Sequence, residues 1–224
     1  MEPNKVTRKY AAFCPNCYHV IHNAAEIVIV PSSIKLDKVH DVTVDGGIDI
    51  DCPKCNHPEG YMLLIDNDIA DAVSILNKIG YHTRFSCQGH SRTHANRNDD
   101  VQPIVSYPYV YIMGKKRISK KLIKCFMKAG FMDVAFKGET DNRRLETEED
   151  IKEVMKHSTA SFYYGRKETT TFLFRQAAEI DRDRSISKKD AIHRLGYMTR
   201  FFFSNRSKFL GEILTKAYCE ELGE

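Results

Sequence analysis

Four of the seven cysteines form two pairs with the spacing Cys-x-x-Cys: Cys14 with Cys17, and Cys52 with Cys55. Two thiolates on one tight turn can bind the same metal ion from one side, and a second such turn completes a tetrahedron. Proline follows the first cysteine of each pair and restricts φ, which favours a preformed turn. A histidine follows two residues after each pair, so the two turns form a small internal repeat. The pattern predicts a closed structural site in which all four cysteines bind Zn²⁺.

Two alternatives to this site stay open from the residues alone. A Cys-x-x-Cys pair can also form a disulfide or a thiol–disulfide redox couple. A histidine could replace one thiolate, although we expect His19, His22 and His57 to lie at the surface or beside the site. The 34 residues between the pairs exceed the spacing of about 15–20 in a compact zinc site. This extra length predicts an added hairpin or a long loop.

A second group of chemically capable residues follows a predicted strand at 81–87. It offers a hydroxyl, a thiol, an amide and an imidazole within five residues: Ser86, Cys87, Gln88, Gly89 and His90. Cys87 could be a nucleophile with His90 as its base, or both could bind a second metal with His94. The turn could instead hold a phosphate or carboxylate through its backbone N–H groups and His90. The structural alternative places Cys87 in the core and His90 at a turn.

Basic residues are unevenly distributed along the chain. Residues 1–65 contain six Lys/Arg and eight Asp/Glu, whereas residues 66–224 contain 28 and 22, so the excess positive charge lies after residue 65. The segment 115–128 has seven basic residues and no acidic one. A helix would place most of them opposite its apolar face, where they could follow a phosphate backbone or form an ordinary solvated surface. We expect phosphate contacts from Lys120, Lys121 and Lys124.

Hydrophobic periodicity predicts the elements that position these groups. We expect helices at 66–79, 119–129 and 148–157. Gly80 and Gly130 end the first two helices, and Asp66 is expected to cap the first. We expect strands at 81–87, 104–112, 131–137, 161–164 and 169–174. The polar residues 91–103 predict a long loop.

The C-terminal segment is predicted to be helical, with a break at Ser204-Asn205. Three aromatic residues, Phe201-Phe202-Phe203, lie among basic residues in this segment. They could stack on nucleic-acid bases, pack in the core of a helical pair, or form a contact between copies of the chain.

These elements predict an α+β protein: a β-rich zinc ribbon at 1–65, an α/β sandwich at 66–175 and a C-terminal helical segment at 176–224. With 42% hydrophobic and 29% charged residues, the 224-residue chain is not wholly disordered. No apolar run approaches the about 20 residues that span a bilayer. The N-terminus also lacks the apolar run of a secretory signal. We therefore expect a cytoplasmic protein that does not bind membranes.

The four cysteines give residues 12–65 a resemblance to the zinc-ribbon family, which implies a β-rich module stapled by Zn²⁺. The run Gly-Tyr-His-Thr-Arg-Phe-Ser-Cys-Gln-Gly-His at 80–90 resembles a motif in poorly characterised bacterial and phage proteins that also begin with a zinc ribbon. That resemblance covers residues 12–112 and implies no particular activity. A more distant similarity is to the tRNA wybutosine-synthesis methyltransferase family, whose turn is Ser-Cys-Ser-Gly-Arg; Gln88 and His90 replace its second Ser and its Arg. It implies a turn that lines a nucleotide or nucleic-acid site.

Three hypotheses for function follow from these observations. The first is a cytoplasmic zinc-binding protein of phage or mobile-element origin that binds nucleic acid or a nucleotide-like ligand as a regulatory or accessory factor. The second is an enzyme that modifies RNA or nucleotides at Cys87 and His90. The third is a zinc-stapled protein–protein interaction module that forms a homo-oligomer through its C-terminal helices.

Overall fold

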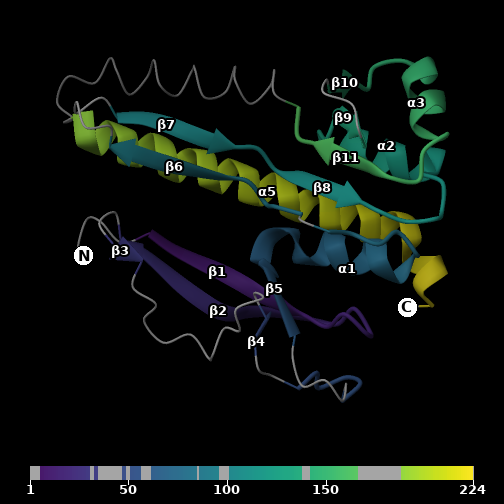
Figure 1. Cartoon of the computed structure of the whole chain (residues 1–224), viewed down its shortest axis with the longest axis horizontal. Helices are drawn as coiled ribbons and strands as arrows, with labels where there is room; N and C mark the ends of the chain where they lie inside the picture. Colours follow the sequence, from purple (N-terminus) through teal and green to yellow (C-terminus); the bar gives the residue numbers. More distant parts are fainter. Residues whose placement is uncertain are drawn as a thin grey trace.

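The computed structural model describes residues 6–30, 33–34, 47–48, 51–56, 62–84, 86–95, 101–137, 142–165 and 188–223. These residues form two larger antiparallel sheets, a two-stranded ribbon, and helices that pack beside them (Figure 1). The predicted α+β class is therefore confirmed.

The N-terminal sheet is antiparallel throughout, in the order β3-β2-β1-β5-β4. Its strands are β1 (Val6–Phe13), β2 (Val20–Val30), β3 (Ser33–Ile34), β4 (Gly47–Ile48) and β5 (Met62–Asp66). The central strand β1 ends in the core, because Ala11 and Ala12 are fully buried and Phe13 nearly so. The N-terminal module is β-rich, as the sequence predicts.

The second sheet is also antiparallel, in the order β10-β9-β11-β8. Its strands and associated helices are β8 (Tyr109–Ile112), α2 (Lys120–Lys128), β9 (Asp133–Phe136), β10 (Arg143–Arg144), α3 (Glu148–Val154) and β11 (Ala160–Tyr163). The register places Phe162 between Val110 and Val134, and all three side chains are fully buried. The ring of Phe126 from α2 stacks on Phe162, with centroids 4.2 Å apart. This apolar face of the sheet therefore packs against α2.

Two helices are each followed by a glycine that ends them, as predicted. The short 3-10 helix η1 (Asn67–Ile69) and α1 (Ala70–Lys78) lead to Gly80, and α2 leads to Gly130. Both glycines have positive φ, at 85° and 89°. In each unit, the residue after the glycine donates its N–H to a carbonyl five residues earlier: Tyr81 to Leu76, and Phe131 to Phe126. Glycine suits these positions because it adopts positive φ without steric cost.

The predicted loop at 91–103 is wrong. Instead, β6 (His90–Ala95) and β7 (Val101–Ser106) pair as a two-stranded antiparallel ribbon. Backbone pairing needs no apolar side chain, so a polar sequence can still form a ladder. Figure 1 shows the ribbon beside the first half of the long C-terminal helix.

Two predicted strands differ from the strands in the structure, and a third lies outside the described residues. The strand expected at 104–112 is divided at Tyr107 and Pro108 into β7 and β8. The strand expected at 81–87 forms only two isolated bridges, Thr83 to Ile112 and Cys87 to Tyr109. The strand expected at 161–164 is β11, whereas its partner at 169–174 lies outside the described residues.

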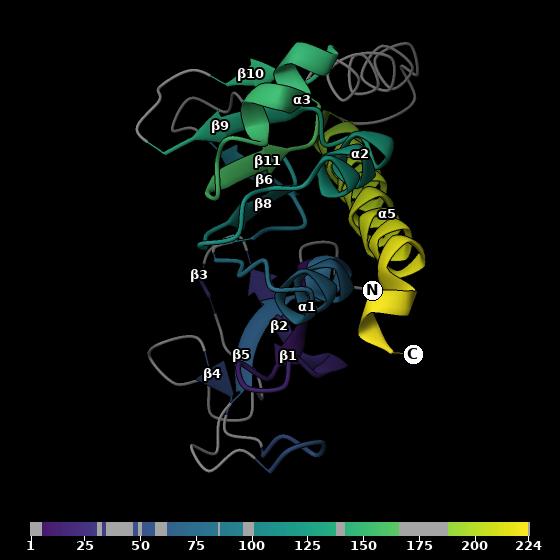
Figure 2. The same cartoon turned by 90° about the vertical axis from the view of Figure 1, so that its right-hand side faces the viewer.

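The C-terminal helix α5 (Lys188–Leu222) is continuous, so the predicted break at Ser204-Asn205 is wrong. Ser204 donates a hydrogen bond to the carboxylate of Asp68, and Ser207 donates one to the carbonyl of Gln88 at 3.1 Å. These small polar residues connect α5 to the rest of the fold and do not end it. Figure 2 shows α5 on the same side of the second sheet as α2.

One large core connects the three predicted segments. It includes Phe13 from β1, Leu76 from α1, Phe162 from β11 and Phe203 from α5. A smaller cluster includes two of the cysteines; its buried members in the described part of the chain are Ala12, Cys14, Cys52 and Met62. The predicted boundaries after residues 65 and 175 stay predictions.

The N-terminus of α3 provides a test of local stability. Thr147 accepts the N–H of Asp150, and the Asp150 carboxylate accepts the N–H of Thr147, which is a complete capping box. We expect Thr147→Ala to lower the free energy of unfolding by about 1 kcal/mol in urea denaturation, whereas Thr147→Ser should have little effect. Equal losses in both variants would contradict a capping role.

The same cap predicts a pH dependence. The hydroxyl of Thr147 and the backbone N–H groups of Thr147 and Glu146 lower the pKa of Asp150. A folded-state pKa below the unfolded value means that this stabilisation is present above the unfolded pKa. It is lost as pH falls through the folded pKa, so the cost of Thr147→Ala should shrink in acid.

Candidate functional site

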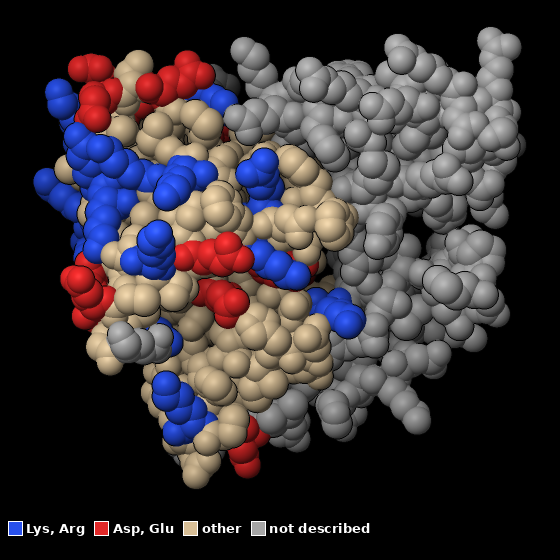
Figure 3. Space-filling view, turned by 180° about the vertical axis from the view of Figure 1, so that it is seen from behind, with Lys and Arg blue, Asp and Glu red and all other residues tan. Residues whose placement is uncertain are grey.

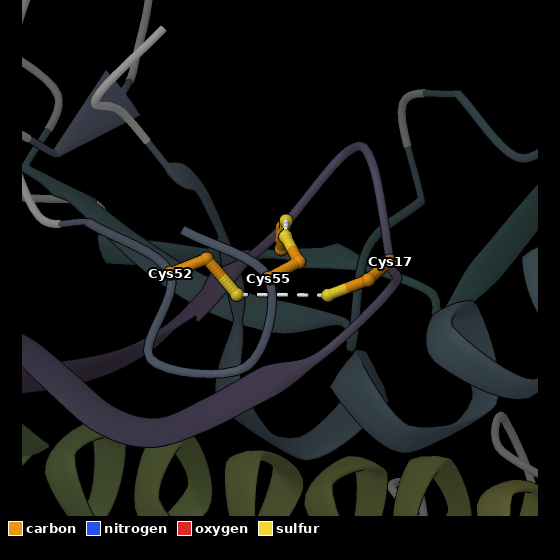
Figure 4. Close-up of side chains that lie close together, drawn as sticks. Cys17, Cys52 and Cys55 are labelled. Atoms are coloured by element: carbon orange, nitrogen blue, oxygen red, sulfur yellow. Dashed lines mark hydrogen bonds between the residues drawn. The ribbon is translucent and has the colours of Figure 1, made fainter. Parts of the chain in front are cut away.

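The four paired cysteines meet at the end of the N-terminal sheet where β1 stops and β5 starts. Because β1 and β5 are antiparallel neighbours, the turn after β1 lies beside the segment that precedes β5. The sulfur of Cys14 lies 3.6 Å from that of Cys55, and the sulfur of Cys17 lies 3.5 Å from that of Cys52 (Figure 4). All four sulfurs lie within 4.8 Å of one another. The fold therefore brings together two turns that are 34 residues apart in the sequence.

These distances suit a tetrahedral metal ion. Metal–sulfur bonds of about 2.3 Å place the sulfurs of an ideal tetrahedron about 3.8 Å apart. A disulfide would instead bring two sulfurs to about 2.05 Å. The structure has all four cysteines as free thiols, so neither pair is bridged. The cluster can hold a metal ion, as the spacing predicts.

The two cysteine turns share one backbone conformation. In each, the residue after the second cysteine donates its N–H to the carbonyl of the first cysteine at 2.9 Å: Tyr18 to Cys14, and Asn56 to Cys52. Tyr18 and Asn56 have φ values of 60° and 44°, in the left-handed region. The repeat in residue types is thus also a repeat in conformation.

Tyr18 connects the first cysteine turn to helix α1. Left-handed φ is unfavourable for a bulky residue, so other contacts must hold Tyr18 in place. Its ring stacks on Phe13 with centroids 6.0 Å apart, and its carbonyl accepts a 2.6 Å hydrogen bond from the Ser74 hydroxyl. The cysteine cluster is thereby fixed to the main core through α1.

The thiols differ in acidity. Burial raises the pKa of Cys17 to about 12 and also raises the pKa of Cys14. Burial opposes ionisation of Cys52 too, but the backbone N–H groups of Lys54 and Cys55 outweigh it and lower its pKa to about 7. Cys52 is therefore the readiest of these three thiols to bind a cation as thiolate. A bound cation would then favour ionisation of its neighbours.

The histidines near the site do not join the cluster within the described residues. His22 faces α1, with Nε2 2.9 Å from the Asp71 carboxylate and Nδ1 3.3 Å from the side-chain oxygen of Asn67. His19 contributes its backbone carbonyl, which accepts the N–H of Cys14 at 2.9 Å. His57 lies outside the described residues.

The turn at 86–90 is part of the packing between the two sheets and α5. Gln88 is 6% exposed. Its side-chain oxygen accepts the N–H of Asp68 at 2.9 Å, and its own N–H donates to the Asp66 carboxylate at 3.1 Å. The side chain of Asp66 makes no capping hydrogen bond to the helix that follows it, so the prediction that Asp66 caps this helix was wrong. With the bond from Ser207 to its carbonyl, Gln88 is connected to β5, η1 and α5.

Cys87 and Gly89 are also buried in this turn. Cys87 is 9% exposed and exchanges two backbone hydrogen bonds with Tyr109, each 2.9 Å long. Its sulfur accepts the N–H of Gly89 at 3.4 Å. Gly89 has a φ of 81° and lies directly against Pro108. Ser86 is half-buried, and its hydroxyl oxygen has no hydrogen-bond partner among the described residues.

The backbone of His90 begins β6, but the side chains of His90 and His94 lie outside the described part of the chain. A Cys87–His90 catalytic pair and a second metal site with His94 therefore stay predictions. So does ligand binding by the turn.

The three lysines expected to contact phosphate lie on the exposed face of α2. Lys120 pairs with Glu148 of α3 at 2.5 Å, and Lys121 pairs with Glu221 of α5 at 2.9 Å. Lys124 is exposed on the same face. The helix thus places all three at the surface, and two of them form ion pairs between helices.

Sequence patterns did not single out Ser74 or Asp68, which connect the site to the fold. The Asp68 carboxylate accepts the hydroxyl of Ser204 and lies 3.3 Å from the Lys208 ammonium, so it joins η1 to α5. The only signal near these contacts was Ser204-Asn205 in a helical segment, which predicts a break instead of a contact.

Among the helices in the described ranges, none combines the length and apolar composition that a bilayer crossing requires. In comparisons with known proteins, no protein-family model, no curated protein and no solved structure matches this chain, so the resemblances set out above stay predictions.

Proposed function

We propose that the protein binds Zn²⁺ at the four-cysteine cluster and nucleic acid on a basic surface of α2, as an accessory or regulatory factor. Four thiolates in tetrahedral arrangement are a donor set that zinc favours. A site closed by four protein ligands has no open coordination position for substrate. The metal would therefore stabilise the N-terminal module and would not catalyse a reaction.

The observation that supports nucleic-acid binding is a dense group of exposed basic residues on and beside α2. We call this group the α2 surface; it comprises Lys115, Lys116, Arg117, Lys120, Lys121, Lys124 and Lys128. Leu122, Ile123 and Phe126 are fully buried on the inward side of α2, so its lysines must face outward. Figure 3 shows Lys and Arg gathered on this side of the molecule. Phosphate is the group that such a surface attracts most strongly.

The ion pairs on the α2 surface do not oppose this function. Both partners of the Lys120–Glu148 pair are about half exposed, at 46% and 53%. Exposed pairs of this kind contribute about 0–1 kcal/mol, so a phosphate can compete with the carboxylate. Arg117, Lys124 and Lys128 enlarge the positive surface beyond the paired residues.

Charge reversal tests this surface. We expect Lys124→Glu with Lys128→Glu to weaken binding of a mixed-sequence oligonucleotide at least about tenfold at low salt. The slope of log affinity against log salt should fall by about one for each lysine, because fewer counterions are released. Fluorescence anisotropy titrations over a range of salt concentrations measure both quantities.

The matched control is Lys9→Glu. This residue is exposed on β1 in the N-terminal sheet, and its reversal changes net charge in the same direction. We expect the control to change affinity little. A loss per residue as large as that of the α2 variant would show that net charge, not the α2 surface, governs binding. Binding by the unaltered protein that is undetectable or independent of salt would exclude the proposal.

A further inference from the structure

One face of the second sheet is turned away from the helices α2 and α5 (Figures 1 and 2). We call it the outer face. Cross-strand partners in an antiparallel sheet point to the same side, so the register assigns its residues in two rows. The first row contains Tyr109, Tyr163, Asp133 and Arg144. The second row contains Tyr111, Ser161 and Ala135.

The segment before β8 adds a further residue to the outer face. The N–H of Arg84 donates to the carbonyl of Tyr111 at 3.0 Å, and Thr83 bridges to Ile112. Arg84 therefore lies opposite Tyr111 and extends the second row at this edge of the sheet. Its side chain is exposed.

An arginine also ends the first row, at the other edge. Arg144 lies 3.2 Å from the carboxylate of Asp133, which is 9% exposed, and 3.3 Å from the carboxylate of Glu146. Arg144 is therefore engaged with two carboxylates within the fold. The exposed arginine of the outer face is Arg84, at the opposite edge.

Three tyrosines stand between these arginines, each half-buried. The rings of Tyr109 and Tyr163 have centroids 5.7 Å apart and planes inclined by 32°. Tyr111 lies two residues from Tyr109, about 6.8 Å along the strand, so it offers a separate ring position. Ser161 and Ala135, which follow Tyr111 in the second row, have small side chains.

We infer that the outer face binds single-stranded nucleic acid, with bases stacked on Tyr111 and Tyr163. Tyrosine rings that an antiparallel sheet leaves partly exposed can stack on unpaired bases, and the exposed side chain of Arg84 offers a cation for a phosphate. A duplex hides its base faces, so the ligand of this surface is a single strand. Burial raises the pKa of Tyr109, so its hydroxyl stays protonated beside the polyanion.

This inference rests on the proposed function but uses a different surface. The α2 surface would contact phosphates irrespective of strandedness, whereas the outer face would bind unpaired bases. The two surfaces lie on opposite sides of the second sheet, so variants on one leave the other unchanged.

Aromatic substitutions test the inference. We expect Tyr111→Ala and Tyr163→Ala each to weaken binding of a labelled, mixed-sequence single-stranded RNA by about 5- to 150-fold. The salt slope should not change, and Tyr111→Phe and Tyr163→Phe should keep most of the affinity because the ring remains. Phe201→Ala, which removes a 60%-exposed ring from α5, is the matched control and should have no effect.

Photo-crosslinking of the unaltered protein gives a result that does not depend on how variants fold. With RNA containing 5-iodouridine, we expect mass spectrometry to find crosslinks at Tyr111 or Tyr163.

Crosslinks restricted to 115–128, with full binding by the alanine variants, would overturn the inference and leave the proposed function intact. Absence of any salt-dependent binding would exclude the proposed function itself. If Tyr111→Ala instead converts a dimer to a monomer in light scattering, the outer face is a protein interface and the inference is wrong.

Discussion

Replacing Cys52 by alanine, or removing the metal with a chelator, is expected to unfold the cysteine turns and the strands beside them. Cys52 is only 2% exposed and its sulfur lies 3.5 Å from that of Cys17, so its loss opens the cysteine cluster and leaves a cavity. Apparent binding energies of structural zinc are about 10–16 kcal/mol, comparable to the whole stability of a domain. We expect metal analysis to find about one zinc per unaltered chain and almost none in Cys52→Ala.

Hydrogen exchange can locate the unfolding. We expect β1 and β5 to lose most of their protection in the metal-free protein, because the buried cluster there is small and two of its described members, Cys14 and Cys52, belong to the proposed site itself. The second sheet has a much larger core and should keep its protection. Cys219→Ala is the matched control, since this half-buried thiol lies near the end of α5, away from the cluster. Unchanged protection of β1 and β5 without metal would contradict a structural role for the ion.

Local patterns in the sequence predicted the features that depend on neighbouring residues. The spacing of the paired cysteines predicted the metal cluster, because two residues between thiols define one turn. The glycines at 80 and 130 predicted two helix ends, because positive φ is a local requirement. Such features need no knowledge of where distant segments pack.

Features that depend on distant contacts were not predicted. Ser204-Asn205 suggested a break, and the contacts of Ser204 and Ser207 were not foreseen because their partners, Asp68 and Gln88, are more than 100 residues away in the sequence. The ribbon of β6 and β7 was missed because its ladder requires no apolar pattern. The outer face was missed for a similar reason. Alternation at Tyr109 and Tyr111 shows that they share one side of a strand, but only the packing of α2 shows which side is covered.

The turn at 86–89 is where these distant contacts meet. Through Gln88 it is joined to β5, η1 and α5, and through Cys87 it is joined to β8. The backbone N–H groups of Cys87, Gln88 and Gly89 and the side-chain oxygen of Gln88 are thus already engaged within the fold. Any ligand at this turn would have to bind beside these contacts or replace them. The structural importance of the turn can be measured without knowing such a ligand.

Gly89→Ala is expected to be strongly destabilising. Gly89 has a φ of 81°, and an added Cβ would lie 2.8 Å from the backbone nitrogen of Pro108 and 2.6 Å from its ring. Neither group can rotate away, so backbone strain and steric overlap should together lower the free energy of unfolding by about 4 kcal/mol.

Gly80→Ala is the matched control, because φ is 85° there but the nearest atom, in the flexible side chain of Lys116, is 3.9 Å away. The free energy of unfolding of the Gly80→Ala variant should fall by only about 1–2 kcal/mol, because backbone strain is then the sole cost. Thermal unfolding should therefore show a much larger drop in melting temperature for Gly89→Ala than for Gly80→Ala. Equal drops would mean that the turn can move away from Pro108, which would free it to rearrange around a ligand.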